Sequence, residues 1–204
     1  MQTTKGPPPP PLPFALRPMQ PDDIPAVMAI ERRSFPSPWP EAAYRYELGN
    51  GTDSQFYVLY HLLPPSPMHN QLWRIKDQAV ILGYMGARFH ARSAHVSTIA
   101  VHRDWRGQGL GKYLLLTLLE IAAALQAPRA TLEVRPSNWI AQRLYAQCGF
   151  VHSGTERFYY RDGEDAWLMV LEPLHGSTIT HLRMLRQQVR ERLVSLSAHC
   201  DVRR

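Results

Sequence analysis

The chain has 204 residues and is 45% hydrophobic. This is long and apolar enough for one domain with a full core, but the chain is too short for two such domains. Its formal net charge is +6 at pH 7. From residue 176 onward there are six arginines and two acidic residues, so about +4 of the charge belongs to the tail and about +2 to the rest. This distribution argues against a nucleic-acid-binding body.

Membrane, secreted and metal-dependent classes are also disfavoured. No segment approaches the roughly 20 apolar residues of a membrane span, and residues 1–13 are too proline-rich for a signal peptide. We therefore expect a soluble, cytoplasmic protein without membrane contact. Cys148 and Cys200 lie far apart, with no C-x-x-C spacing and no histidine pair at ligand spacing. We expect neither a structural disulfide nor a metal site.

The first third of the chain predicts a leader followed by short elements. Prolines dominate residues 1–13, which favours a polyproline II or disordered leader. Apolar residues at helical spacing follow Asp22 and predict a helix that ends near Ser34. The other elements expected here are a strand at 15–17, a helix at 41–48, a strand at 55–60 and a long hairpin loop at 62–77.

The middle of the chain predicts a strand, a glycine turn, a helix and a strand. Short apolar runs at 79–87, 95–101 and 130–134 have the length of strands. Between the last two, residues 110–125 carry leucines and an isoleucine at helical intervals. A parallel crossover unit is the natural interpretation.

The last elements of the domain are expected to be a helix and two strands. Ser137 is predicted to cap a helix that runs to about Cys148. Two apolar runs, at 151–159 and 166–171, then predict strands.

Residues 177–196 predict an amphipathic helix, with leucines and Val189 on one side and arginines on the other. One interpretation is that this helix packs on the domain or pairs with its copy, which would give a monomer or a weak dimer. The other is that it contacts the ribosome or nucleic acid. The chain therefore divides into a leader at 1–13, a domain at 14–174 and a basic helical tail at 175–204.

Residues 106–111, with the sequence Arg-Gly-Gln-Gly-Leu-Gly, fall between a predicted strand and a predicted helix. Glycines let the backbone approach a ligand closely, and free N–H groups at a helix start attract an anion such as pyrophosphate. A Walker loop is excluded because Tyr113 follows the Gly-Lys pair, and the G-x-G-x-G spacing differs from the dinucleotide fingerprint. The glycines alone also fit a tight structural turn.

Several segments in order resemble the GCN5-related N-acetyltransferases and, among them, the RimI-type branch of ribosomal-protein alanine N-acetyltransferases. The matching segments are Val-Ser-Thr-Ile-Ala-Val-His at 96–102, R-x-x-G-x-G at 106–111, Leu-Glu-Val-Arg-Pro-Ser-Asn at 132–138, Leu-Tyr-Ala-Gln-Cys-Gly-Phe at 144–150, Phe-Pro-Ser-Pro-Trp at 35–39, and Tyr-Tyr-Arg-Asp-Gly-Glu-Asp-Ala at 159–166. The resemblance covers residues 14–174. It implies an α/β fold with a mixed, mainly antiparallel sheet that is splayed at a central parallel strand pair, and with helices on both faces.

The resemblance also implies an enzyme that takes acetyl-coenzyme A as co-substrate and acetylates the N-terminal amine of a protein, including a ribosomal protein. The residues it implies for acetyl-coenzyme A are Ile99, Ala100 and Val101 along the pantetheine arm, Arg106, Gly107, Gln108, Gly109, Leu110, Gly111 and Lys112 at the pyrophosphate, and Asn138 and Tyr145 near the thioester. Those it implies for the acceptor are Phe35, Pro36, Trp39, Tyr159 and Tyr160. Aromatic residues and prolines at such places are also ordinary loop anchors.

Acetyl transfer needs a neutral amine, a polarised carbonyl and a proton for the departing thiolate. At pH 7 a lysine amine, with a pKa near ~10.4, costs about 3 kcal/mol more to deprotonate than an α-amine near ~8. Glu133 is the candidate base, because it should face away from its apolar neighbours Leu132 and Val134. Tyr145 is the candidate acid. A solvated or salt-bridged strand carboxylate and a core tyrosine are the plain alternatives, and the resemblance favours the catalytic roles.

Three further expectations concern the oxyanion donor, Cys148 and the acidic turn near the site. A backbone N–H at a distortion of the strand near Ile99 and Ala100 is expected to bind the carbonyl oxygen. Cys148 should face the core of its helix, so we expect direct attack in a ternary complex without an acyl-enzyme. Glu164 and Asp165 lie in a charged turn that is expected to be solvated, and they receive no role.

Two other functions stay open at this point. One keeps the fold and the co-substrate but acetylates a small amine or a lysine. The other is a non-catalytic module that binds coenzyme A or docks on the ribosome. Retention of Arg106, Gly109, Gly111, Glu133 and Tyr145 argues against the non-catalytic module.

Overall fold

The computed structural model describes residues 14–50, 53–62, 79–90 and 93–200. The predicted leader at 1–13 and nearly all of the predicted loop at 62–77 lie outside these residues. Within the described residues, no helix is long and apolar enough to cross a membrane.

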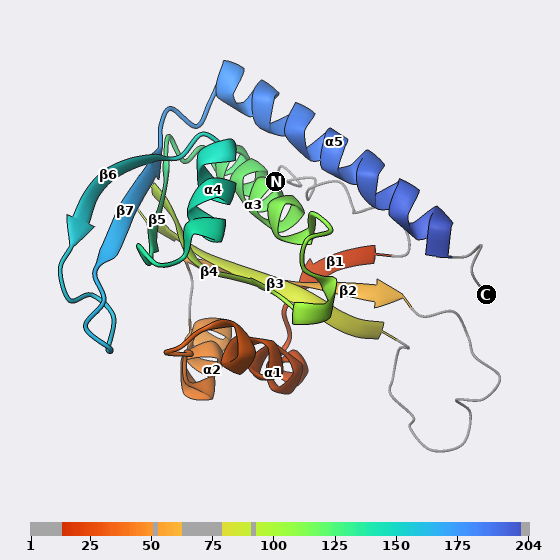
Figure 1. Cartoon of the computed structure of the whole chain (residues 1–204), viewed down its shortest axis with the longest axis horizontal. Helices are drawn as coiled ribbons and strands as arrows, with labels where there is room; N and C mark the ends of the chain where they lie inside the picture. The colour runs from red at the N-terminus through yellow and green to blue at the C-terminus, as the bar shows by residue number, and fades with distance from the viewer. Residues whose placement is uncertain (1–13, 51–52, 63–78, 91–92, 201–204) are drawn as a thin grey trace.

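One sheet organises the described part of the chain (Figure 1). Its order is β1-β2-β3-β4-β5-β7-β6, and every neighbouring pair is antiparallel except β4 and β5, which are parallel. The strands are β1 (Phe14–Pro18), β2 (Ser54–Leu62), β3 (Ala79–His90), β4 (Ser93–Val101), β5 (Ala130–Val134), β6 (Val151–Glu156) and β7 (Ala166–Leu171). The expected mixed, mainly antiparallel sheet with one central parallel pair is confirmed.

Helices cover both faces of the sheet, as expected. The helices are α1 (Ile24–Ser34), α2 (Glu41–Asn50), α3 (Leu110–Ala124), α4 (Trp139–Gln147) and α5 (Ser177–Cys200). Figure 1 shows α3, α4 and α5 on one face and α1 and α2 on the other. The chain connects β4, α3 and β5 in that order, which is the predicted parallel crossover.

The helix α3 is buried around most of its circumference. Leu114, Leu115 and Leu116 are consecutive and all fully buried. Consecutive residues of a helix point about 100° apart, so only a helix covered on several sides buries three in a row. The sheet covers one side of α3, and α5 runs across another (Figure 1).

The apolar side of α5 packs on the domain. Leu182 and Leu193 are fully buried, and Leu185 and Val189 pack against the same core. Arg186 of α5 also pairs with Glu120 of α3 at 2.7 Å. The tail helix therefore packs on the domain, as the first of the two interpretations proposed.

Two element boundaries differ from the sequence predictions for local chemical reasons. The cap of α4 is Asn138, not Ser137, because the Asn138 side chain accepts a hydrogen bond from the Ala141 N–H at 3.2 Å. The strand β6 ends at Glu156, not at residue 159, because the chain turns at Phe158, where φ is +54°.

The other differences are at the ends of elements. The helix α1 starts at Ile24 because Pro21–Asp23 form a separate 3-10 turn. The helix α5 continues to Cys200, four residues past the predicted end. Strands β2, β3 and β4 are each longer than predicted, because their flanking polar residues also pair in the sheet.

Candidate active site

The parallel strands β4 and β5 separate soon after they begin. They pair at Ala94 with Ala130 and at His95 with Thr131. Beyond these pairs, β4 stays with β3 while β5 pairs with β7. The expected splay is therefore present, and it leaves the β5-facing edge of residues 96–101 available to a ligand.

The distortion in β4 lies at Ser97. Thr98 pairs with Gly86 and Val96 with Ala87, so Ser97 is an extra residue between two registered pairs. An extra residue bends a strand and re-aims its neighbours. The prediction placed this distortion near Ile99 and Ala100, two residues too late, because hydrophobic alternation does not mark a bulge.

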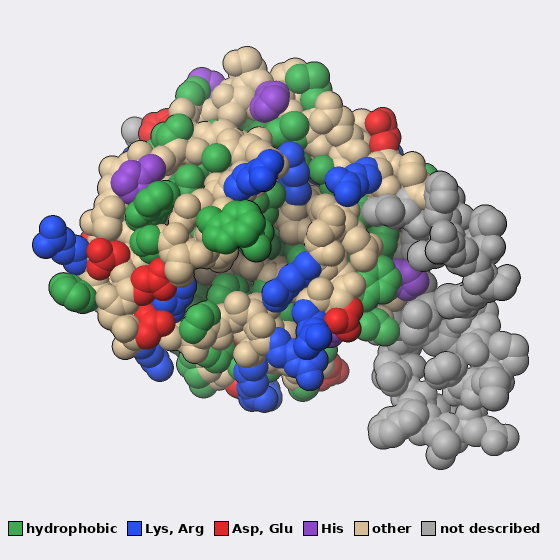
Figure 2. Space-filling model, viewed as in Figure 1, with side chains coloured by type: hydrophobic (Ala, Val, Ile, Leu, Met, Phe, Trp, Pro, Cys, Tyr) green, Lys and Arg blue, Asp and Glu red, His purple; other side chains and the backbone are tan. Residues whose placement is uncertain are grey.

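A cavity of about 300 Å³ lies at the splay. It receives residues from the segment after α1, from β4, β5 and α4, and from the hairpin between β6 and β7. These include Phe35, Trp39, His95, Ile99, Glu133, Asn138, Tyr145, Tyr159 and Tyr160. Both candidate catalytic residues and four of the five candidate acceptor residues therefore meet at one cavity, while Pro36 is not among its lining residues. Figure 2 shows the surface hollowed near its centre, with hydrophobic and basic side chains around the hollow.

Glu133 faces the cavity from β5. Its neighbours Leu132 and Val134 are buried on the other side of the strand, as the alternation predicted. The Glu133 Oε2 atom lies 3.2 Å from His95 Nε2, and His95 Nδ1 lies 3.3 Å from Thr131 Oγ1. The Glu133–His95 pair therefore bridges the two strands that splay.

His95 was missed by sequence reasoning. It occupies the half-buried side of β4, in alternation with the buried Ala94 and Val96. That alternation placed His95 on the same face as other polar residues. Only the strand pairing brings it to Glu133.

Tyr145 lines the cavity from α4, opposite β5. Burial raises the pKa of Tyr145 to about 12, so the phenol is protonated at neutral pH. Cys148, one turn later, is 1% exposed, and burial raises the pKa of its thiol to about 11. A buried, protonated thiol is a poor nucleophile.

The glycine turn precedes α3 as predicted. Gly107 and Gly109 have φ of +77° and +98°, a region that L-residues with side chains rarely adopt. Gly109 is the N-cap of α3 and supplies no capping side chain, and the first turn contains no acidic residue. The first N–H groups of α3 therefore suit an anionic ligand.

The Arg106 side chain braces this turn. Its guanidinium donates to the Val101 carbonyl at 3.0 Å and to Ser34 Oγ at 2.7 Å. It thereby ties the turn to the end of β4 and to the end of α1. These two hydrogen bonds fix the position of the turn. The positive charge of the guanidinium also favours an anionic ligand.

The hairpin after β6 is fastened to β5 by Arg135. The guanidinium donates to Asp162 at 2.8 Å and to Glu164 at 2.7 Å, and it stacks 3.7 Å above the Tyr160 ring. The hydrogen bonds from Arg135 hold the pKa of the Asp162 carboxyl below its usual range, and hydrogen bonds from Ser137 and Arg135 do the same for the pKa of Glu164.

Glu164 and Asp165, which received no role from the sequence, are half-buried and accept hydrogen bonds within the chain. Glu164 accepts from Arg135 and Ser137, and Asp165 accepts from the Phe158 N–H at 2.9 Å. Arg135 itself was not a candidate, because nothing in its local sequence identifies a partner 27 residues away.

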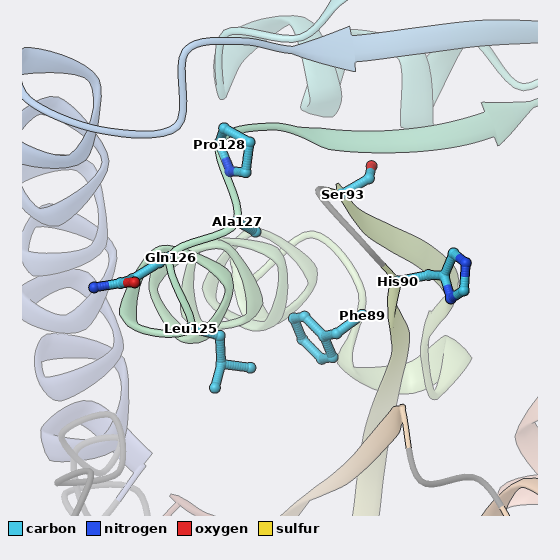
Figure 3. Close-up of a pocket in the computed structure, with 7 residues that line it drawn as sticks. All are labelled: Phe89, His90, Ser93, Leu125, Gln126, Ala127 and Pro128. Carbon is cyan, nitrogen blue, oxygen red and sulfur yellow. The ribbon is translucent and has the colours of Figure 1, made fainter. Parts of the chain in front are cut away.

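A second, larger cavity of about 570 Å³ lies elsewhere (Figure 3). It opens between the end of β3, the start of β4 and the segment that follows α3. Its lining residues are Phe89, His90, Ser93, Leu125, Gln126, Ala127 and Pro128. His90 lies 3.9 Å from a carboxylate oxygen of Asp53, but the residues that line this cavity include no carboxylate and no lysine. The smaller cavity at the splay, which Glu133, His95 and Tyr145 line together, is therefore the better reaction site. Within the described residues, no cluster of histidine, cysteine and acidic side chains is suited to a metal ion.

Comparisons with known proteins agree with this geometry. The model of the acetyltransferase (GNAT) family matches residues 24–150. The putative [ribosomal protein bS18]-alanine N-acetyltransferase of Bacillus subtilis is 35% identical over 156 residues, which are 76% of this chain and 93% of that protein. The N-alpha-acetyltransferase RimI of Mycobacterium tuberculosis is 34% identical over 65% of this chain and 74% of its own length.

Among solved structures, the ribosomal-protein-S18-alanine N-acetyltransferase from Escherichia coli has a TM-score of 0.64 with 27% identity. The similarity covers 80% of this chain and 96% of that one.

Proposed function

The chain belongs to the acetyltransferase (GNAT) family and is an N-acetyltransferase, and we propose that it acetylates the N-terminal α-amine of a protein. The proposed acetyl donor is acetyl-coenzyme A, and the proposed acceptor is an alanine-like N-terminus, including that of a ribosomal protein. The observation that carries this proposal is the cavity at the splay, where Glu133, His95 and Tyr145 face one another.

The site fits the proposed donor. The open edge of β4 at residues 96–101 can bind an extended, amide-bearing arm as a strand would. The glycine turn and the first N–H groups of α3 suit a pyrophosphate at the end of that arm. Backbone groups make both features, so binding of the donor at these two places does not depend on charged side chains.

In the proposed mechanism, Glu133 accepts a proton from the α-ammonium, with His95 Nε2 3.2 Å from its carboxylate. The neutral amine attacks the thioester carbonyl carbon, and a backbone N–H beside the Ser97 bulge receives the developing negative charge on oxygen. The carbon–sulfur bond then breaks, and Tyr145 donates its phenolic proton to the departing sulfur. The attacking nitrogen loses its second proton, which restores the phenol of Tyr145, and Glu133 releases its proton to solvent. The products are the acetylated amine and the free thiol.

The acetyl group is proposed to pass directly between the two substrates in a ternary complex. Cys148 is buried, and burial raises the pKa of its thiol, so it is not available as a thiolate to form an acyl-enzyme. Replacing Cys148 by Ala is expected to leave turnover largely unchanged.

An α-amine is the preferred acceptor class because one carboxylate–imidazole pair suffices to deprotonate it. A lysine amine would require about 3 kcal/mol more at pH 7. The relatives named above as alanine and N-alpha-acetyltransferases support the same acceptor class. Cytoplasmic location, oligomeric state and any ribosome or nucleic-acid contact through α5 stay predictions.

The first test is thiol release from acetyl-coenzyme A in the presence of a hexapeptide that begins Ala-Arg. The same peptide with a blocked N-terminus and an added lysine is the matched control, and spermidine tests the small-amine alternative. Turnover with the free N-terminus alone supports the proposal. Turnover only with the lysine peptide or with spermidine would overturn the proposed acceptor while leaving the acetyltransferase chemistry in place.

A further inference from the structure

A buried carboxylate on α1 takes no part in the proposed proton transfers. Glu31 is 1% exposed and lies at the edge of the cavity. One of its oxygens accepts the Trp39 N–H at 2.8 Å. The other accepts the hydroxyl of Tyr44 at 3.0 Å and the hydroxyl of Tyr84.

These contacts leave Glu31 poorly suited to act as a base. Both carboxylate oxygens are already occupied by donors from three other parts of the chain: the segment after α1, the helix α2 and the strand β3. A buried carboxylate is stable only when such donors replace its lost hydration. The burial raises the pKa of Glu31, while the hydrogen bonds from Trp39 and Tyr44 act in the opposite direction.

The donors to Glu31 also pack on one another. The ring centroids of Trp39 and Tyr44 lie 5.6 Å apart, and those of Tyr44 and Tyr84 lie 6.0 Å apart. Phe56 of β2 contacts both Trp39 and Tyr44. Glu31 is therefore the polar centre of an aromatic cluster that joins the segment 35–39 to the sheet.

That segment forms one wall of the cavity. Phe35, Ser37 and Trp39 all line it, on the side opposite α4 and the hairpin that carries Tyr159. The segment lies between α1 and α2, and prolines at 36, 38 and 40 remove three backbone N–H donors from it. The bond from the Trp39 N–H to Glu31 therefore fixes a stretch of chain that has few other backbone donors.

We propose that Glu31 is a positioning residue for the acceptor: it holds the segment 35–39 against the sheet in the shape that receives the first residues of the incoming chain. The inference rests on the proposed function, because it concerns the acceptor side of the same cavity. Glu31 acts through Trp39, because both of its carboxylate oxygens are occupied by hydrogen-bond donors of the chain.

The test compares Glu31→Ala and Glu31→Gln with Asp23→Ala. Asp23 is a matched control because it is also a buried carboxylate, 6% exposed, that accepts from Arg17 and from the Gln20 N–H. It does not line the cavity. Glu31→Gln keeps the shape and one acceptor oxygen, so it also serves if Glu31→Ala does not fold.

Two readouts are combined. Hydrogen exchange at residues 35–41 reports on the segment without any need for activity. Steady-state kinetics report the KM for the acceptor and the KM for acetyl-coenzyme A separately, with whichever acceptor the wild type turns over, peptide or spermidine.

We expect Glu31→Ala to speed exchange at residues 35–41 and to raise the acceptor KM roughly tenfold, with the acetyl-coenzyme A KM within twofold of the wild type. Glu31→Gln should raise the acceptor KM about threefold, as a weakened version of the same contact. Asp23→Ala should lower the thermal midpoint and leave both KM values near the wild type.

Three outcomes would overturn the inference: unchanged exchange in both Glu31 variants, faster exchange with an unchanged acceptor KM, or an equal rise in acceptor KM for Asp23→Ala. A wild type that prefers spermidine over the peptide would instead overturn the proposed protein acceptor. In that case a higher spermidine KM in the Glu31 variants would still support the positioning role.

Discussion

The two parts of the proposed site, the donor turn at 106–111 and the acceptor cavity at the splay, are built in different ways. The donor turn is contiguous in sequence, and the groups proposed to bind the ligand are backbone N–H groups exposed by glycines with positive φ. On the acceptor side, the walls come from distant segments that are joined by side-chain carboxylates and arginine. Glu31 reaches Tyr84 across 53 residues, and Arg135 reaches Asp162 across 27.

This difference indicates which parts of the sequence control donor binding and which control acceptor binding. A backbone cradle is specified by a short motif, so it tolerates changes in the rest of the chain. A wall assembled by long-range hydrogen bonds and ion pairs depends on several positions at once, so its shape can be changed by substitutions far from the reacting atoms. Donor binding and acceptor binding should therefore respond to different sets of substitutions.

Replacing Glu133 by Gln should have the largest effect of the four substitutions considered next. Loss of a general base typically costs 10²- to 10⁴-fold, so we expect kcat to fall about 10²- to 10³-fold. Binding of acetyl-coenzyme A, measured by calorimetry, should change little, because Glu133 contacts His95 and not the glycine turn. Glu156→Gln, on an exposed position of β6, is the control. Strongly weakened binding of acetyl-coenzyme A in Glu133→Gln would contradict the claim that donor binding and acceptor binding depend on different residues.

Replacing Gly109 by Ala should raise the KM for acetyl-coenzyme A roughly tenfold. The residue has φ of +98°, which residues with side chains rarely adopt, so the alanine is strained even though its Cβ would make only ordinary contact, 3.4 Å from Val189 Cγ1. Strain of this kind costs about 1–3 kcal/mol. The acceptor KM should stay near that of the wild type. Gly176→Ala, with φ of +59° and open space around it, provides the matched control, and an equal effect there would show that the turn is not special.

Replacing Arg135 by Lys should raise the acceptor KM about fivefold with little change in donor binding. Lysine keeps the charge but loses the planar guanidinium, which donates from one nitrogen to both Asp162 and Glu164 and stacks on Tyr160. Arg161→Lys, on the same hairpin, is the control. If donor binding falls as much as acceptor binding, the hairpin does not belong to the acceptor side alone.

The same cluster predicts a pH dependence. The pKa values of Asp162 and Glu164 are lowered in the folded protein, so their attraction to Arg135 is fully present above the ordinary carboxyl range near ~4. It is lost only as the pH falls through the lowered values. Hydrogen exchange at residues 157–165, corrected for intrinsic rates, should therefore be equal at pH 7 and pH 5 in the wild type. Loosening already at pH 5 would contradict this account.

Replacing Val189 by Ala should have the smallest effect, a two- to threefold rise in the acetyl-coenzyme A KM. Val189 packs α5 next to Gly109, outside the region matched by the family model. Leu182→Ala is the control, because Leu182 is fully buried on α5 but lies two turns away along the helix. A core truncation of that kind costs about 2–5 kcal/mol, so Leu182→Ala should lower the thermal midpoint more and the donor affinity less. The opposite ranking would show that α5 only stabilises the fold.

A similar division separates the site residues that the sequence could predict from those that it could not. The glycine turn, Glu133 and Tyr145 could be proposed from the sequence because the spacing within their own segments and the resemblance to family motifs single them out. His95, Arg135 and Glu31 were missed because each looks ordinary in its own segment. Their roles depend on partners that only the folded chain brings near.

By itself, the sequence determined the α/β class, the order of elements, the glycine turn and the candidate base and acid, because hydrophobic periodicity and short motifs are local properties. Only the tertiary structure decided where β4 bulges, how β4 and β5 separate, which carboxylates fasten the acceptor walls and where α5 packs. Those features are contacts between distant residues, and their energies depend on burial and on pairing geometry that no local spacing encodes.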